Sequence, residues 1–275
     1  MLYSLLFLTM LGVGIGCKKE VEEQPIPNLQ NCRIVKETYS TVYITGDKDD
    51  PQEVVAEGDK FTVYGWKETK YIYNGAGLLI QKYIQVLKGT KGKSTATYTY
   101  EKNKLTIHTI NQNSGQPDQE SDAIITLTNQ GFNANYFYDA EGHQLGMTGQ
   151  PIQSGAEWVG GNRIKEWFRA SEEEGTRILV YQYDLTKPAL PNPYAYRGKP
   201  SQNLETQYQI QAENSLVYKN GPQYPLFQIN SYYEFDKYGR ISRLIMRDHR
   251  FPNNGWSFIT NPGGIGVIDY EYECP

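Results

Sequence analysis

One short pattern recurs along the chain and indicates its architecture: two aromatic residues separated by one other residue, then Asp, Asn or Glu, then a turn that often contains Gly. Alternate aromatic residues place two rings on one face of a strand, the polar residue caps the turn, and Gly supplies a positive φ. Each copy therefore predicts half of a β-hairpin. The copies are Tyr71-Ile72-Tyr73-Asn74, Tyr98-Thr99-Tyr100-Glu101, Tyr136-Phe137-Tyr138-Asp139, Tyr181-Gln182-Tyr183-Asp184, Tyr233-Glu234-Phe235-Asp236 and Tyr270-Glu271-Tyr272-Glu273.

Further strand signals lie between these copies, and no window shows a long, capped helical period. Trp158 to Ile164 predicts a hairpin that turns on Gly160 and Gly161. We therefore expect an all-β fold: an antiparallel meander of many hairpins that forms a closed or nearly closed, barrel-like sheet. The other predicted strands span residues 33–45, 105–110, 124–128, 163–169, 178–181 and 241–246.

The composition supports a globular domain and disfavours one class of partner. The chain has 23 Tyr, and this residue suits a half-buried sheet surface where the ring packs and the hydroxyl stays in water. The net charge of -4 gives no basic field for phosphates, so nucleic-acid binding is disfavoured. We expect a single domain over residues 31–275.

The first 16 residues carry no charge and are rich in Leu, Phe, Val, Ile and Gly. Such a stretch is too short to cross a bilayer, which needs roughly 20 apolar residues, and suits a secretory signal peptide. The sequence Gly14-Ile15-Gly16-Cys17 then resembles the lipobox of bacterial lipoproteins. That resemblance implies that Cys17 is diacylated and becomes the N-terminus of the mature protein, which is anchored to a membrane without crossing it.

Residues 17–30 are charged and then contain Pro25 and Pro27, so we expect the lipidated Cys to be followed by an extended tether. Acidic residues soon after such a Cys resemble the surface-export signal of Bacteroides-type lipoproteins, although Lys18 and Lys19 intervene. The predicted location is the cell envelope, as an outer-membrane lipoprotein that faces the periplasm or the cell surface.

A wider resemblance covers residues 31–274. Its motifs are Cys32-Arg33-Ile34-Val35-Lys36, the aromatic hairpins, Leu127-Thr128-Asn129-Gln130-Gly131 and a late Tyr-x-Phe-Asp-x-x-Gly-Arg-Ile that starts at Tyr233. Together they resemble a Bacteroides-type lipoprotein family whose domains are of unknown function and porin-like. The resemblance implies a many-stranded β-meander or barrel and no known reaction. The aromatic motif also resembles the longer and more regular repeats of Rhs-type toxin shells.

The sequence contains no familiar catalytic motif or metal-binding motif, and it implies no cofactor. His108, His143 and His249 are too far apart in the sequence to form a metal pair on one helix, and each is interpreted as an ordinary strand or turn residue. An acidic cluster could offer oxygen ligands to Ca²⁺, but its spacing fits no defined loop, so a solvated turn is favoured. Its residues are Asp47, Asp49, Asp50 and Glu53, and the glycines at 263, 264 and 266 are likewise interpreted as a turn.

Three features bear on ligands. The four tryptophans, Trp66, Trp158, Trp167 and Trp256, could stack on sugar rings, although core packing is the commoner role of such residues. Residues 185–203 contain four prolines, and a segment of this kind is either a binding loop or a packed crossing segment. We favour the crossing segment. Residues 111–121 are expected to form a polar loop.

The two remaining cysteines, Cys32 and Cys274, lie at the start of the first predicted strand and the end of the last. Closing the sheet would make these strands neighbours and remove two unpaired edges. An even cysteine pair in an exported protein then predicts a disulfide. The alternative is two free thiols on opposite edges of an open sheet.

We carry three functional hypotheses forward from the sequence. The first is a noncatalytic module that binds a glycan, a peptide or an envelope protein. The second is a glycan-active or other hydrolytic enzyme whose site has no recognised motif. The third is a transmembrane barrel, which requires an outward apolar band and is disfavoured by polar strands such as Thr95 to Tyr100.

Overall fold

The computed structural model describes residues 32–42, 48–89, 92–149, 153–214, 227–250 and 264–274, and within them the regular secondary structure is β-strand apart from one 3-10 turn. No described helix is long and apolar enough to span a membrane. The elements are β1 Arg33–Thr41, β2 Gln52–Ala56, β3 Asp59–Tyr73, β4 Leu79–Val86, β5 Gly92–Glu101, β6 Lys104–Asn113, β7 Gln119–Thr126, β8 Tyr136–Tyr138, β9 Gln144–Met147, β10 Ser154–Val159, β11 Asn162–Ser171, β12 Gly175–Pro188, the 3-10 turn η2 Ala195–Arg197, β13 Asn203–Glu213, β14 Phe227–Phe235, β15 Ile241–Arg250 and β16 Ile265–Glu273.

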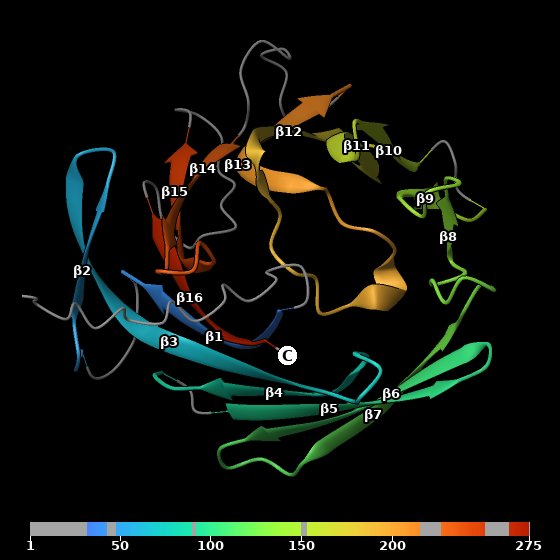
Figure 1. Cartoon of the computed structure of the whole chain (residues 1–275), viewed down its shortest axis with the longest axis horizontal. Helices are drawn as coiled ribbons and strands as arrows, with labels where there is room; N and C mark the ends of the chain where they lie inside the picture. Colours follow the sequence, from blue (N-terminus) through green and yellow to red (C-terminus); the bar gives the residue numbers. More distant parts are fainter. Residues whose placement is uncertain are drawn as a thin grey trace, which may run out of the picture.

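Fourteen of these strands form one antiparallel sheet that curls into a ring (Figure 1). The order around the ring is β10-β11-β12-β13-β14-β15-β16-β1-β3-β4-β5-β6-β7, with β2 paired to β3 outside this path. Most neighbours in the ring are also neighbours in the sequence, as the repeated hairpins predict. The all-β meander is thus confirmed.

The first and last strands are neighbours, as predicted. Strand β1 pairs antiparallel with β16, with Arg33 opposite Glu273 and Thr41 opposite Gly266. This pairing does not close the sheet, because in the described strands β7 and β10 remain its two edges. The short β8–β9 hairpin lies between those edges. The sheet is therefore nearly closed, and its opening lies far along the sheet from the paired termini rather than at them.

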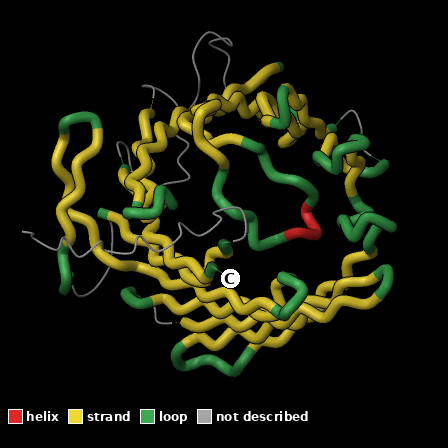
Figure 2. The backbone as a smooth tube through the Cα atoms, viewed as in Figure 1, coloured by secondary structure: helices red, strands yellow, loops and turns green. Residues whose placement is uncertain are grey.

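The proline-rich connection between β12 and β13, residues 189–202, crosses the inside of the ring (Figure 2). We call it the plug. Its backbone hydrogen-bonds to three places on the wall: Asn133 N donates to Tyr196 O, Lys199 N to Gly142 O and Gln202 N to Gly161 O, at 2.8 to 2.9 Å. The predicted crossing segment is confirmed, although β12 takes its first residues, up to Pro188.

The aromatic repeats form the inner wall of the ring. Tyr71 and Tyr98 are buried in one cluster with Tyr196 of the plug, and Tyr194 lies edge-on to Tyr71 with ring centroids 6.3 Å apart. The hydroxyls of Tyr71 and Tyr73 donate to protein groups, to Glu37 Oε2 and Ile34 O respectively, both at 2.8 Å. The expectation that tyrosine hydroxyls stay in water is thus wrong for this repeat, because its rings face the interior instead of an outer surface.

The β2–β3 hairpin extends outside the ring (Figure 1) and covers part of its outer wall. A separate apolar cluster lies beneath it. Strands β15 and β16 thus have apolar residues on both faces, which is why their sequences lack a clean alternation of apolar and polar residues. The buried members of the cluster are Val54, Ala56, Val63, Ile245, Ile265 and Val267.

Two other predictions concern the polar loop at residues 111–121 and the N-terminal segment. The expected polar loop at residues 111–121 is confirmed only for residues 114–118, since β6 continues to Asn113 and β7 begins at Gln119. Polar side chains are compatible with strands here because β7 is an exposed edge. The signal peptide, Cys17 and the tether lie outside the described residues.

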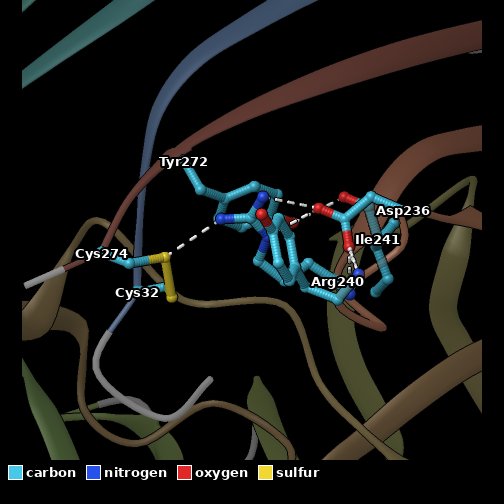
Figure 3. The surroundings of a disulfide bond; sticks show 7 residues. Cys32, Asp236, Arg240, Ile241, Tyr272 and Cys274 are labelled. Atoms are coloured by element: carbon cyan, nitrogen blue, oxygen red, sulfur yellow. Dashed lines mark hydrogen bonds and ion pairs between the residues drawn. A yellow bond between two sulfur atoms is a disulfide. The ribbon is translucent and has the colours of Figure 1, made fainter. Parts of the chain in front are cut away.

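The Cys32–Cys274 disulfide is present and joins the ends of β1 and β16, with the Cα atoms 4.2 Å apart (Figure 3). Arg240, from the turn between β14 and β15, donates to Cys274 Sγ at 3.1 Å. Its guanidinium also forms an ion pair with Asp236 at 2.6 Å. The bond therefore fixes both ends of the domain against a neighbouring turn.

Removal of this disulfide is expected to destabilise the whole domain. It links residues 242 positions apart, for which the chain-entropy model gives at most about 5.5 kcal/mol. Urea unfolding should show a lower midpoint for Cys32→Ser/Cys274→Ser than for the parent, with Cys17→Ser in both proteins so that no third thiol interferes. Equal midpoints would contradict a stabilising role.

The contact between the plug and the β8–β9 hairpin can be tested at Gly198. A Cβ there would lie 2.7 Å from Tyr138 Cε1 and 2.8 Å from Gly142 O, at a φ of +89°. Gly115 has a similar φ of +80° with nothing within 4 Å, so Gly115→Ala is the matched control. We expect Gly198→Ala to cost roughly 2 to 4 kcal/mol of unfolding free energy and Gly115→Ala about 1. Equal costs in urea unfolding would show that the contact is loose.

Candidate ligand-binding cavity

The plug divides the interior of the ring into a packed side and a hollow side. Toward β1, β3, β5 and β16 its aromatic residues fill the space among the wall tyrosines. Toward β10–β15 a cavity of about 480 Å³ remains, which lies in the size range of small-molecule sites. The residues that line it include Gln144, Trp158, Arg163, Tyr183, Leu190, Asn192, Arg197, Lys199, Ser201, Asn203, Glu205, Tyr208, Ser231, Tyr233, Leu244 and Met246.

Glu205 of β13 is an acidic residue in this lining. Burial raises the pKa of its carboxyl to about 7, against a partial opposing effect from Arg163. Within the described residues its carboxyl forms no hydrogen bond and no ion pair. A carboxyl that titrates near neutral pH inside a cavity is a typical feature of functional sites.

Arg163 of β11 lies close to Glu205 and is only partly satisfied by protein groups. Its Nη1 forms an ion pair with Glu166 Oε2 at 2.9 Å, and its guanidinium lies 4.8 Å from the centre of the Tyr181 ring. Its Nε is buried and has no hydrogen-bond partner in the structure. A buried donor without a partner is costly, and a ligand that accepts from it would recover that cost.

Three tyrosines of the lining differ in what their hydroxyls bind. Tyr183 donates to Arg163 O at 2.7 Å, and Tyr233 donates to Glu205 O. The hydroxyl of Tyr208 has no hydrogen bond within the described residues, and burial raises its pKa to about 12, so it is neutral at physiological pH. The hydroxyls of Tyr183 and Tyr233 therefore link strands of the wall to each other, and the hydroxyl of Tyr208 is available to a ligand.

Two residues of the plug that line this cavity, Arg197 and Lys199, have cationic side chains. The Arg197 guanidinium lies 4.7 Å from the centre of the Tyr194 ring, among the aromatic residues of the packed side. Neither side chain forms an ion pair within the described ranges. Both belong to the exposed residues of the plug, so their charges are hydrated.

Trp158 presents an aromatic ring at the edge of the cavity near β9. Its indole stacks on His143, with centroids 4.4 Å apart, and its Nε1 donates to Gln144 O at 2.8 Å. His143 is in turn fixed by Asp139, whose Oδ2 lies 2.9 Å from Nδ1. These contacts hold the indole in one orientation.

A second, smaller cavity of about 330 Å³ also touches the plug and lies next to the disulfide. Its lining is mostly apolar and includes Cys32, Pro188, Pro191, Phe235 and Tyr272, with Arg240 as a charged member. Figure 3 shows Arg240 between the disulfide and Asp236. Because both of these neighbours already engage Arg240, this cavity offers fewer free polar groups than the larger one.

The histidines singled out from the sequence do not come together. His108 is on the exposed side of β6 with Asp122, and His143 is the buried partner of Trp158. His249 contacts Glu57, whose pKa burial would raise but hydrogen bonds from Tyr232, Asn230 and His249 lower to about 2. No group of three potential metal ligands occurs among the described residues.

The remaining predicted residues are also dispersed. Asp49, Asp50 and Glu53 are exposed before and within β2, whereas Asp47, Gly263 and Trp256 lie outside the described residues. Trp66 is exposed on β3, and Trp167 packs on Gly155, so Trp158 alone of the described tryptophans lines the cavity. Sequence analysis did not identify Glu205 and Arg163, because only the fold brings them together. The proline-rich segment was the one feature of the sequence that indicated the region of this cavity.

The pKa of Glu205 gives a stability test. A carboxyl whose folded-state pKa lies above its ordinary value stabilises the fold at low pH, and this contribution is lost as pH rises toward about 7. Replacing it by Gln should remove that pH dependence. The unfolding free energy of Glu205→Gln relative to wild type should therefore be higher at pH 8 than at pH 4.5, by at most about 3 kcal/mol. Urea unfolding of Glu205→Gln, with the exposed Glu213→Gln of the same strand as control, measures this. Parallel stability curves for Glu205→Gln and wild type would contradict it.

Comparisons with known proteins return structural neighbours of low sequence identity. No protein-family model matches the chain, and no curated protein matches it. A solved structure of a porin-like protein from Bacteroides uniformis is 14% identical, covers 87% of this chain and 98% of its own, and has a TM-score of 0.40. A porin-like protein from Bacteroides vulgatus is 9% identical, with the same coverage and a TM-score of 0.26.

Proposed function

We propose that this protein is a noncatalytic binding protein of the cell envelope, anchored through Cys17, that holds a small polar ligand beside its plug. The observation that carries the proposal is the cavity, whose polar groups are not all used by the protein. Glu205, Tyr208 and the Nε of Arg163 are without hydrogen-bond partners among the described residues. Free polar groups that converge on one space are the usual mark of a ligand site.

The lining favours a saccharide over an apolar ligand. Sugar rings offer apolar faces that stack on aromatic side chains, and hydroxyls that both donate and accept hydrogen bonds. The cavity supplies rings from Trp158, Tyr208 and Tyr233, and polar side chains from Gln144 and Ser201. Its volume of about 480 Å³ is enough for a mono- or disaccharide.

Glu205 is also the observation that favours the alternative, a glycan-cleaving enzyme. A carboxyl protonated near neutral pH suits a general acid, but glycoside hydrolysis ordinarily requires a second carboxylate on the other side of the bond. The nearby Glu166 is engaged by both Arg163 and Tyr181. We therefore favour binding, and release of reducing sugar from any bound disaccharide would support the enzyme instead.

The outer wall of the ring suits water, which supports a lipid anchor over insertion of the sheet. Lys36 of β1 forms ion pairs with Glu68 of β3 at 3.1 Å and with Glu271 of β16 at 3.0 Å. Glu37, the next residue, faces the interior and accepts from Tyr71, so the Lys36 pairs lie on the outer face. Charged pairs on that face would be costly in lipid.

Filling the cavity should abolish binding. We expect Ser231→Trp, which adds an indole to the inner face of β14, to lose the ligand found by screening neutral and acidic mono- and disaccharides against wild type. Glu234→Trp adds the same ring at an exposed position of that strand and should bind normally. Isothermal titration calorimetry provides the measurement, and equal affinities of the two variants would place the ligand elsewhere.

Cys17→Ser should release the protein from the membrane. The lipobox-like sequence motivates this prediction, since a diacylated Cys supplies the two chains that stable anchoring needs. Fractionation of expressing cells should recover wild type with membranes and Cys17→Ser in the soluble fraction. Membrane retention of the variant would refute the anchor at this residue.

A further inference from the structure

Hydrophobic and cationic side chains gather at one rim of the ring, where β12 ends and β14 turns into β15. Leu185 is 72% exposed and Phe235 is 41% exposed, although both are large apolar residues. Lys187 and Lys237 are exposed as well. The Lys187 ammonium lies 5.0 Å from the centre of the Phe235 ring, and that of Lys237 lies 4.8 Å from the Tyr238 ring. We call Leu185, Lys187, Phe235 and Lys237 the rim patch.

The chain enters the described domain beside this patch. Cys32, Lys187 and Phe235 line one cavity, the smaller and mostly apolar one next to the disulfide. Cys17 is 15 positions before Cys32 in the sequence. A lipid at Cys17 would therefore hold this rim, rather than another part of the ring, close to a membrane.

The short tether makes even weak contact with a membrane effective. A flexible chain of 15 residues has a root-mean-square length of roughly 20 Å, which keeps the rim patch within reach of the lipid surface. A site held at this distance experiences a local lipid concentration of about millimolar or more. Contact that is too weak to retain a free protein can thus orient an anchored one.

Building on the anchor of the proposed function, we infer that the rim patch is a membrane-contact surface that docks on a bilayer containing anionic lipids. Leu185 and Phe235 enter the boundary between headgroups and acyl chains, and Lys187 and Lys237 lie at the level of the lipid phosphates. The anchored domain then stands with its disulfide on the membrane side, and the turn between β6 and β7 at the opposite rim points away.

The residue types of the patch match the boundary between water and lipid. Surfaces that bind there combine exposed apolar side chains, which enter the acyl boundary, with Lys or Arg, which meets anionic headgroups. Lysine can also lay its aliphatic stem along an apolar surface while its ammonium stays in water, and Lys187 has this position beside Phe235. The rim patch therefore has both components.

The charges around the patch favour anionic lipids over zwitterionic ones. The neighbouring acids are engaged by other groups: Asp236 forms an ion pair with Arg240 at 2.6 Å, and Asp184 accepts a hydrogen bond from the Thr186 hydroxyl at 2.6 Å. Neither lysine of the patch forms an ion pair within the described residues. Each lysine near an anionic membrane surface strengthens binding by about fivefold.

A second copy of the chain is a less favourable occupant of the patch. Contact between two rim patches would bring their lysines together, and like charges oppose such an interface. A stable protein interface also uses roughly 20 to 30 residues on each side, far more than this patch offers. A lipid surface needs no matching shape, so a small patch suffices.

Vesicle flotation of the mature chain carrying Cys17→Ser tests the patch without any lipid anchor. One set of vesicles contains phosphatidylcholine alone, and the other contains about one third phosphatidylglycerol. We expect half-maximal binding to the anionic vesicles at about 1 to 10 mM lipid, weaker than a single acyl chain provides. Binding to the neutral vesicles should be about tenfold weaker or less detectable, and salt at about 0.5 M should reduce the anionic case to that level.

Two double variants separate the apolar from the ionic contribution. Leu185→Ser with Phe235→Ser, and separately Lys187→Gln with Lys237→Gln, should each weaken binding to the anionic vesicles by about tenfold or more. Binding that remains in the lysine variant should no longer depend on salt. Because all four side chains are exposed, we expect the variants to keep the urea midpoint of the parent.

Val55→Ser with Lys60→Gln is the matched control, since both residues are exposed on the β2–β3 hairpin, away from this rim. It should bind vesicles as the parent does. An equal loss in this control, equal binding of the parent to both kinds of vesicle, or no binding of the parent at about 10 mM lipid would each overturn the inference.

A dimer in sedimentation equilibrium that disappears in Leu185→Ser/Phe235→Ser, without flotation of the parent, would assign the surface to a second copy and overturn the inference as well. None of these results bears on acylation of Cys17 or on the saccharide site. Cell fractionation tests the first and the saccharide screen tests the second, so failure of the rim patch is distinguishable from failure of the proposed function.

Discussion

A ring of thirteen strands encloses more space than its own side chains can fill, because roughly eight strands already leave an interior just wide enough for side chains to meet. Everything else in the interior depends on how this space is occupied. The chain places residues 189–202 inside, and three backbone hydrogen bonds from this plug reach the wall at Asn133, Gly142 and Gly161. Two of these contacts lie in the stretch between β7 and β10, so the plug also supports the place where the sheet is open.

The plug has different surroundings on its two sides, and this asymmetry produces the candidate site. On one side Tyr196 and its neighbours complete an aromatic core with Tyr71 and Tyr98, where burial of the large rings stabilises the fold. On the other side a cavity remains between the plug and strands β10–β15. There Glu205 and Arg163 are held in a partly desolvated space without full hydrogen bonding, which costs stability in the free protein. Proteins commonly keep such costs at sites that bind ligands.

The sequence predicts the fold better than it predicts the site, and the reason is physical. Hairpins are local, so Tyr71 and Tyr73 with the turn at Asn74 suffice to predict one, and Cys32 with Cys274 indicates which distant strands meet. The face on which the rings pack is not local. Alternation places Tyr71 and Tyr73 on one face but does not say that this face is the inside of a wide ring, so their hydroxyls were expected in water.

The site depends on long-range placement throughout. Glu205 and Arg163 are 42 positions apart, on strands separated by β12, and neither carries a motif. Only the run of prolines between β12 and β13 marked the region, because fixed φ angles and missing amide donors exclude a central strand there. Likewise, the polar residues 111–121 suggested a loop, yet an exposed edge strand tolerates them.

The central claim is that the plug is a fixed part of the interior, and hydrogen–deuterium exchange of the native protein tests it most directly. The account predicts that the amides of Lys199 and Gln202, which donate to Gly142 O and Gly161 O, exchange as slowly as amides within β12 and β13. Exchange of these amides at the rate of an open surface loop would show that the plug leaves the ring, and would remove the cavity on which the proposed function rests.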